Sequence, residues 1–135
     1  MGLKDRDLIT LKEIDGPATP HDAFLKRAVG LRQEALACVA DVARLAEYVG
    51  GEVEGLGLHE DWALSKEVFP GVRLHFVFSR ADGEFPASLR VLYSGSRIRK
   101  ISGEDLIELT MACLNHMLRY VKETAADPPE ICRKV

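Results

Sequence analysis

The segment Val72-Arg73-Leu74-His75-Phe76-Val77-Phe78-Ser79 decides the fold class, because its side chains alternate with a period of two. One face carries only large apolar side chains, those of Val72, Leu74, Phe76 and Phe78. The other face is mixed and carries Arg73, His75, Val77 and Ser79. Alternation of this kind predicts a β-strand that lies on the core with one face only.

Turn-forming residues on both sides of this segment predict antiparallel neighbours. The turn at residues 69–71 leads back to an alternating run at 62–68, and the turn at 81–84 leads on to another at 88–93. A further turn at 94–96 precedes a short predicted strand at 97–101. Parallel pairing would need long crossovers, so we predict an antiparallel meander of three to four strands.

The chain before the meander has the pattern of one long helix or two. Thr19 suits the N-cap position and Pro20 the first helical position, while Gly50-Gly51 suits the end. Apolar or small residues recur between these points at alternating spacings of four and three, at Phe24, Ala28, Leu31, Ala35, Cys38, Val42, Leu45 and Val49. Gly30 leaves open whether the helix is continuous.

A last helix is predicted from Ser102, its N-cap, to the Pro128-Pro129 pair that stops it. The expected fold class is therefore α+β: an antiparallel meander of three to four strands, with the N-terminal helix or helices and the C-terminal helix packed on one face. We expect an N-terminal segment at 1–18, one domain at 19–126 and a tail at 127–135.

Composition excludes several classes of protein. The 135 residues carry a net charge of -3, and 47% are hydrophobic. No apolar run approaches the ~18 residues of a membrane span, and the charge argues against nucleic-acid binding. The three cysteines form no C-x-x-C pair, and Met1–Arg6 are not followed by an apolar signal-peptide core. A cytoplasmic protein is expected, without membrane, nucleic-acid or cofactor binding.

Four short segments together resemble a known family. They are Phe69–Leu74, Asp82–Pro86, Val91–Ser94 and Gly103–Leu106. This pattern is similar to a family of small prokaryotic α+β proteins catalogued as domain of unknown function 3786, over roughly the C-terminal half. The resemblance implies an α+β fold and a cytoplasmic setting, and it implies no reaction.

Arg73, His75 and Arg90 form the first candidate site, for a ligand. All three are predicted on one face of the sheet, where a histidine flanked by arginines could bind an anion or act as an acid or base. The alternative interpretation is an exposed outer face with scattered charge. Arg97, Arg99 and Lys100 extend the basic character, and a solvated strand edge explains them better than nucleic-acid binding.

Cys113 and His116 form the second candidate site, for a metal ion. Their spacing of three places them on one helical face. The alternative is a buried small thiol beside a histidine at the edge of the core. His59-Glu60-Asp61 has metal-ligand composition but lacks the spacing of a helical zinc motif, so we predict a loop there.

The first predicted helix also offers a candidate interface. A continuous stripe of this length would extend beyond the strands it covers, so part of it would need a partner, and a symmetric dimer is the commonest solution. We therefore predict a homodimer that uses Phe24, Leu31, Val42 and Leu45. No catalytic motif is present. The expected function is a non-enzymatic protein-interaction or small-ligand-binding module, and the alternative is a small enzyme or metal-binding protein using the sites above.

Overall fold

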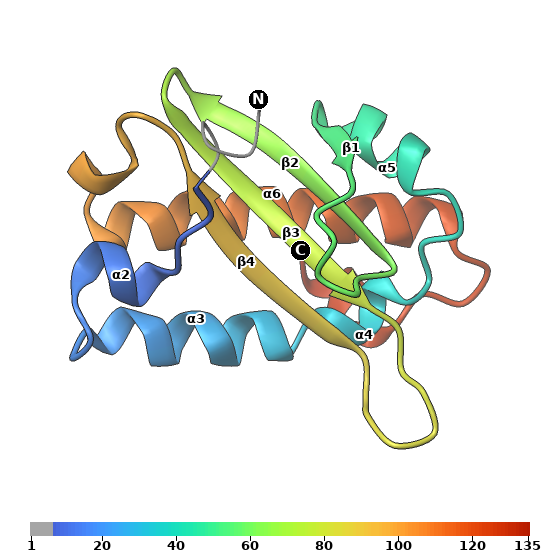
Figure 1. Cartoon of the computed structure of the whole chain (residues 1–135). Coiled ribbons are helices and arrows are strands. Elements are labelled where there is room, and N and C mark those ends of the chain that lie inside the picture. The colour runs from blue at the N-terminus through green and yellow to red at the C-terminus, as the bar shows by residue number, and fades with distance from the viewer. Residues whose placement is uncertain (1–6) are drawn as a thin grey trace.

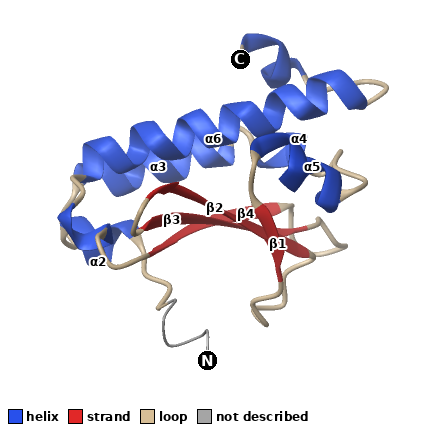
Figure 2. Cartoon of the chain, turned by 90° about the horizontal axis from the view of Figure 1, so that it is seen from above, coloured by secondary structure: helices blue, strands red, loops and turns tan. Residues whose placement is uncertain are grey.

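One antiparallel sheet forms the centre of the computed structural model, which describes residues 7–135. Its four strands lie side by side in chain order: β1 (Glu52–Glu54), β2 (Trp62–Phe69), β3 (Val72–Ser79) and β4 (Ser88–Ser94). The helices pack on one face of this sheet (Figures 1 and 2). The predicted α+β class and antiparallel meander are confirmed.

The register of the sheet separates its two faces as the alternation predicts. Phe76 lies opposite Leu64 of β2 and Val91 of β4, on the face that packs against the helices. His75 lies opposite Ser65 and Leu92, on the far face. β1 was not predicted, because a strand of only three residues is too short to show an alternation.

The predicted long first helix is wrong in length, because the chain forms several short helices. They are α2 (Leu11–Asp15), α3 (Pro20–Gly30), α4 (Gln33–Leu36) and α5 (Val42–Val49). α3 ends at Gly30, and the carboxylate of Asp41 caps a new helix by accepting bonds from the N–H groups of Ala43 and Arg44. Gly50 ends α5 with a left-handed φ of 76°. The prediction for the C-terminal helix is confirmed by α6 (Gly103–Thr124), which Ser102 caps.

The strand predicted at the margin of the sheet is absent. Residues 97–101 instead contain the 3₁₀ turn η1 (Ile98–Lys100), where the buried Ile98 anchors the chain before α6. Near the start of the described residues, 7–135, Ile9 pairs with the sheet through a bridge to Tyr93 of β4. A capping box between Thr10 and Glu13 begins α2 directly after it.

The core lies between the sheet and the helices. Leu74, Phe76 and Phe78 of β3 are fully buried there, together with Leu106, Leu114 and Leu118 of α6. The C-terminal turn η2 (Glu130–Lys134) contributes the buried Cys132. Within residues 7–135, no helix has both the length and the apolar character that crossing a bilayer requires. Residues 1–6, which begin the predicted N-terminal segment 1–18, lie outside the described part of the chain.

Candidate functional site

His75 lies at the centre of a buried polar cluster on the far face of the sheet. Its Nδ1 is 2.6 Å from Oε2 of Glu54, and its Nε2 is 2.7 Å from Oγ of Ser94. Glu54 comes from the end of β1 and Ser94 from the end of β4. The side chain of His75 is completely buried, so the interpretation of this face as exposed and scattered with charge is wrong at His75.

Arg73 joins this cluster through a neighbouring serine. Its Nη1 donates a hydrogen bond of 2.9 Å to Oγ of Ser65, which lies opposite His75 in β2. Glu67 and Glu52 lie 3.6 and 3.9 Å from the guanidinium, and both carboxylates are well exposed. The charge of Arg73 is therefore already compensated.

Arg90, the third predicted ligand-binding residue, lies apart from the other two. It sits opposite Val77 on the same face of the sheet, and its side chain is exposed. No hydrogen bond or ion pair joins it to His75 or Arg73 among the described residues. The structure thus brings His75 and Arg73 into one polar cluster and places Arg90 at a separate feature, the cavity described next.

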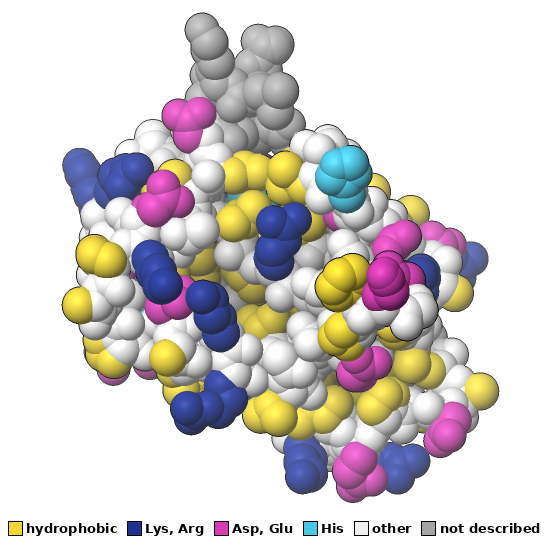
Figure 3. Space-filling model, turned by 60° about the horizontal axis from the view of Figure 1, so that its bottom comes forward, with side chains coloured by type: hydrophobic (Ala, Val, Ile, Leu, Met, Phe, Trp, Pro, Cys, Tyr) yellow, Lys and Arg dark blue, Asp and Glu magenta, His cyan; other side chains and the backbone are white. Residues whose placement is uncertain are grey.

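That feature is a cavity of about 250 Å³ between α3 and the edge of β4. Figure 3 views the molecule from the side of α3, where hydrophobic side chains reach the surface among scattered Lys and Arg side chains. The apolar lining consists of Leu11, Leu25, Val29, Leu89, Val91 and Leu92. The polar lining consists of Thr10, Asp22, Lys26, Gln33 and Arg90.

The charges of this lining do not cancel. The buried Asp22 carboxylate lies 3.2 Å from Nζ of Lys26 and 3.8 Å from Nζ of Lys12, so it is already paired. Arg90, in contrast, has no carboxylate within ion-pair distance in the part of the chain that the structure describes. Among residues 7–135, the lining therefore includes one arginine that forms no ion pair.

The backbone of β4 also faces the cavity. Tyr93 exchanges two hydrogen bonds with Ile9, of 2.8 and 2.9 Å, so its N–H and C=O point away from β3. In an antiparallel ladder this direction alternates from one residue to the next, so every second residue points the same way. The N–H and C=O of Val91 and Leu89 therefore point outward, as those of Tyr93 do. The side chain of Gln33 accepts the Leu89 N–H at 3.2 Å. Within residues 7–135, the outward N–H and C=O of Val91 have no hydrogen-bond partner.

A second hollow, of about 460 Å³, lies beside α6. Phe69, Ile101 and Leu109 give it an apolar floor, and Asp105 and Glu108 give it an acidic rim. The backbone that borders it on the α6 side is helical, with its polar groups already bonded within the helix. It therefore offers a ligand fewer directional contacts than the cavity at β4.

The predicted metal pair lies on α6 as expected, without further ligands nearby. No group of three or more His, Cys, Asp or Glu side chains able to hold a metal ion occurs among residues 7–135. Burial raises the pKa of the Cys113 thiol, and the His116 ring lies 4.9 Å from the ring of Tyr48. Glu60, in the predicted loop, accepts bonds from the N–H groups of Leu56 and Leu58, which lower its pKa.

The four predicted interface residues separate into two pairs. Phe24 and Leu31, in and directly after α3, are 51% and 63% exposed. Val42 is half-buried, and Leu45 is fully buried in the core of the chain. Of these four residues, Phe24 and Leu31 are therefore the two whose large apolar side chains are exposed to a partner.

Fold and cavity together define a small α+β domain with a cavity of about 250 Å³ beside a sheet edge. The chain belongs to the family described as domain of unknown function (DUF3786), whose model matches residues 3–116. The match covers most of the chain, so the expected restriction to the C-terminal half is wrong. No curated protein and no solved structure matches the chain.

The sequence pattern indicated only one residue of this site, Arg90. Val91 appeared as an ordinary strand residue, and Gln33 had no distinguishing context. Their importance comes from the position of β4 at the edge of the sheet, which depends on the strand order.

Proposed function

We propose that this protein is a small-ligand-binding module and that the cavity between α3 and β4 is its binding site. The observation that carries the proposal is the combination of an apolar lining with Arg90, which forms no ion pair with another of the residues 7–135. Ligand sites typically join apolar walls to a few polar groups that fix orientation. The proposed ligand has an apolar body and one carboxylate or similar anionic group.

Octanoate is a suitable first probe, because it has an apolar chain and a single carboxylate. We expect it to shift the backbone amide resonances of α3 and β4 in a titration followed by NMR. Arg90→Gln should weaken binding on the order of tenfold, because a charge-assisted contact to the carboxylate is lost. Val29→Trp should abolish binding by filling the cavity.

Two controls make the experiment specific. Arg27→Gln removes an exposed cation from the same helix without touching the cavity, so octanoate binding should not change. Octylamine has the same apolar length with the opposite charge and should not bind. Equal binding of octylamine and octanoate, or full binding by the Val29→Trp variant, would contradict the proposal.

The module is further proposed to act as a homodimer through Phe24 and Leu31. Residues seven apart along a helix share a face, and both of these side chains are large, apolar and exposed. A cytoplasmic location is proposed on the basis of the three cysteines, all of which are free thiols.

One observation supports the alternative function, an enzyme that uses His75. The order of hydrogen bonds from Ser94 through His75 to Glu54 is that of an activated serine nucleophile. Such a serine must also touch its substrate, whereas Ser94 is only 2% exposed and lies outside the cavity lining. Ligand binding therefore ranks first. Labelling of Ser94 by a fluorophosphonate, detected by peptide mass spectrometry, would reverse that order.

A further inference from the structure

We infer that the ligand of this cavity is the carboxyl-terminal end of an extended peptide, which adds one short strand segment to the free edge of β4. This inference rests on the proposed function, because it assigns a chemical class to the ligand of the same cavity. It goes beyond that function by giving the backbone of β4 a direct part in recognition.

The hydrogen bonds along the β4 edge leave one position open for a peptide. Ile9 satisfies the outward N–H and C=O of Tyr93, and Gln33 satisfies the outward N–H of Leu89. Between these two positions, Val91 presents one N–H and one C=O toward the cavity that it lines. Backbone groups removed from water need partners, and a peptide in extended conformation supplies a matching donor and acceptor at one residue.

A positively charged residue stands next to this open position in the chain. Arg90 directly precedes Val91 and is also part of the cavity lining, so its exposed side chain begins one residue from the backbone groups that would hold the peptide. A carboxylate accepts two parallel hydrogen bonds from a guanidinium. A free carboxyl terminus provides that carboxylate without an acidic side chain, and the apolar lining suits an aliphatic terminal residue.

The limited size of the cavity favours the end of a peptide over an internal segment. A cavity of about 250 Å³ is smaller than the sites of about 300 to 1,000 Å³ that enclose drug-sized ligands. Ile9 and Gln33 also occupy the edge positions on either side of Val91. Only the end of a peptide can therefore be enclosed, because a segment continuing in both directions would collide with one of these neighbours.

The test uses N-acetyl-Ala-Val-Leu with a free carboxylate, beside the same tripeptide with a carboxyl-terminal amide. We expect the free acid to bind on the order of tenfold more tightly than the amide, because only the acid forms the charge-assisted contact with Arg90. In Arg90→Gln the two peptides should bind equally. Binding should also move the Val91 amide proton resonance and slow its exchange with solvent.

Val91→Pro tests the strand pairing itself. It removes the outward N–H, and a proline is tolerated at an edge position where the N–H does not take part in the ladder. The variant should lose the tripeptide and keep octanoate, which needs no backbone partner. Val91→Ala is the matched control, because it shortens the side chain, keeps the N–H, and should keep the tripeptide.

The outcomes separate this inference from the proposed function. If octanoate binds and neither peptide does, the peptide inference is overturned while the ligand-binding function stands. If Val91→Pro binds the tripeptide as well as the wild type does, the strand pairing is overturned. Failure of octanoate and both peptides in the wild-type protein contradicts the inference and the proposed function together. Retained octanoate binding by Val91→Pro shows that the variant is folded.

Discussion

The Nδ1 atom of His75 lies 2.6 Å from Oε2 of Glu54, and these two residues come from strands that β2 separates. The imidazole is completely buried, and the glutamate side chain is nearly so. This hydrogen bond joins buried groups on non-adjacent strands, and it links the end of β1 to β3 on the far face of the sheet. Its loss takes a hydrogen bond away from two side chains that are buried or nearly so.

Replacement of His75 should therefore reduce stability strongly. In His75→Ala the carboxylate of Glu54 and the hydroxyl of Ser94 both lose the imidazole, and we expect the free energy of unfolding to fall by about 3 kcal/mol. Urea denaturation followed by circular dichroism measures this change. Arg27→Ala, an exposed substitution, should stay within about 0.5 kcal/mol of wild type. A His75→Ala variant as stable as that control would show that the cluster is not formed.

Tyr93 should contribute to the alkaline stability limit. Burial raises its pKa to about 12, above the ordinary value of 10.0, and its hydroxyl lies 2.9 Å from Oγ1 of Thr110. Because the folded state favours the neutral phenol, this contribution is complete below pH 10 and is lost as pH rises toward about 12. Tyr93→Phe cannot ionise, so its melting temperature should fall less between pH 9 and 11 than that of wild type. Parallel curves for the two proteins would contradict this prediction.

Asp15 should contribute to the loss of stability at acidic pH. Hydrogen bonds from His21 and Thr19 hold the pKa of its carboxyl below the ordinary value of 3.8. A lowered pKa stabilises the fold above the unfolded-state pKa, and this stability disappears as pH falls through the folded-state value. Asp15→Asn should therefore show a smaller loss of melting temperature between pH 5 and 3. A loss as large as that of wild type would contradict this prediction.

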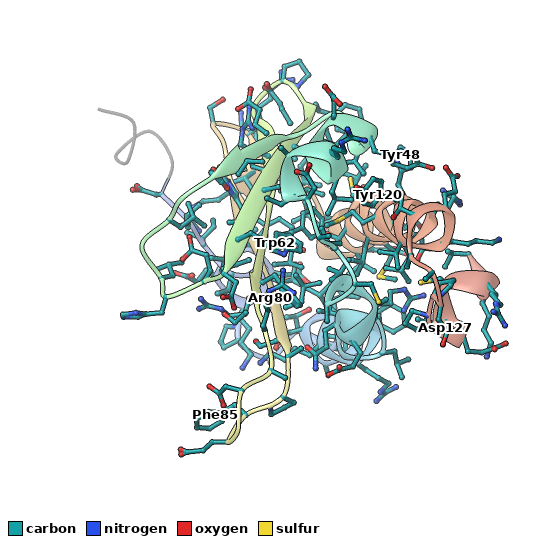
Figure 4. The ribbon with its side chains drawn as sticks, turned by 90° about the vertical axis from the view of Figure 1, so that its right-hand side faces the viewer. Tyr48, Trp62, Arg80, Phe85, Tyr120 and Asp127 are labelled. Carbon is teal, nitrogen blue, oxygen red and sulfur yellow. The ribbon has the colours of Figure 1, made fainter. Side chains whose placement is uncertain are left out.

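Phe24 should control self-association if the proposed dimer forms. Phe24→Glu places a charge on the exposed face of α3, so sedimentation velocity should show a dimer for the wild type and a monomer for the variant. Phe85 offers a matched control, because it is 68% exposed and lies at the tip of the loop between β3 and β4, away from the helices (Figure 4). Phe85→Glu should remain dimeric, and a wild-type monomer at all concentrations would eliminate the dimer.

Periodicity sufficed to predict the central strands and α6, because their buried faces repeat over seven or more residues. It could not predict the interruptions around Leu31 and Asp41, where capping and packing override a repeating apolar pattern. The burial of His75 could not be predicted from periodicity either, since its partners Glu54 and Ser94 lie 21 and 19 residues away in the chain. Arg90 was identified by its charge, whereas Val91 acquires its role only from the strand order.

The single bridge between Ile9 and Tyr93 has a consequence for aggregation. β4 is an edge strand, and an uncovered edge can pair with the strand of another molecule. Ile9 and Gln33 close two positions of this edge, and α3 lies beside it. Conditions that release Ile9 and Gln33 without unfolding the sheet would uncover the row from Leu89 to Tyr93. Fibrillar or amorphous assembly of this protein should then begin at β4, and a ligand held in the cavity should delay it.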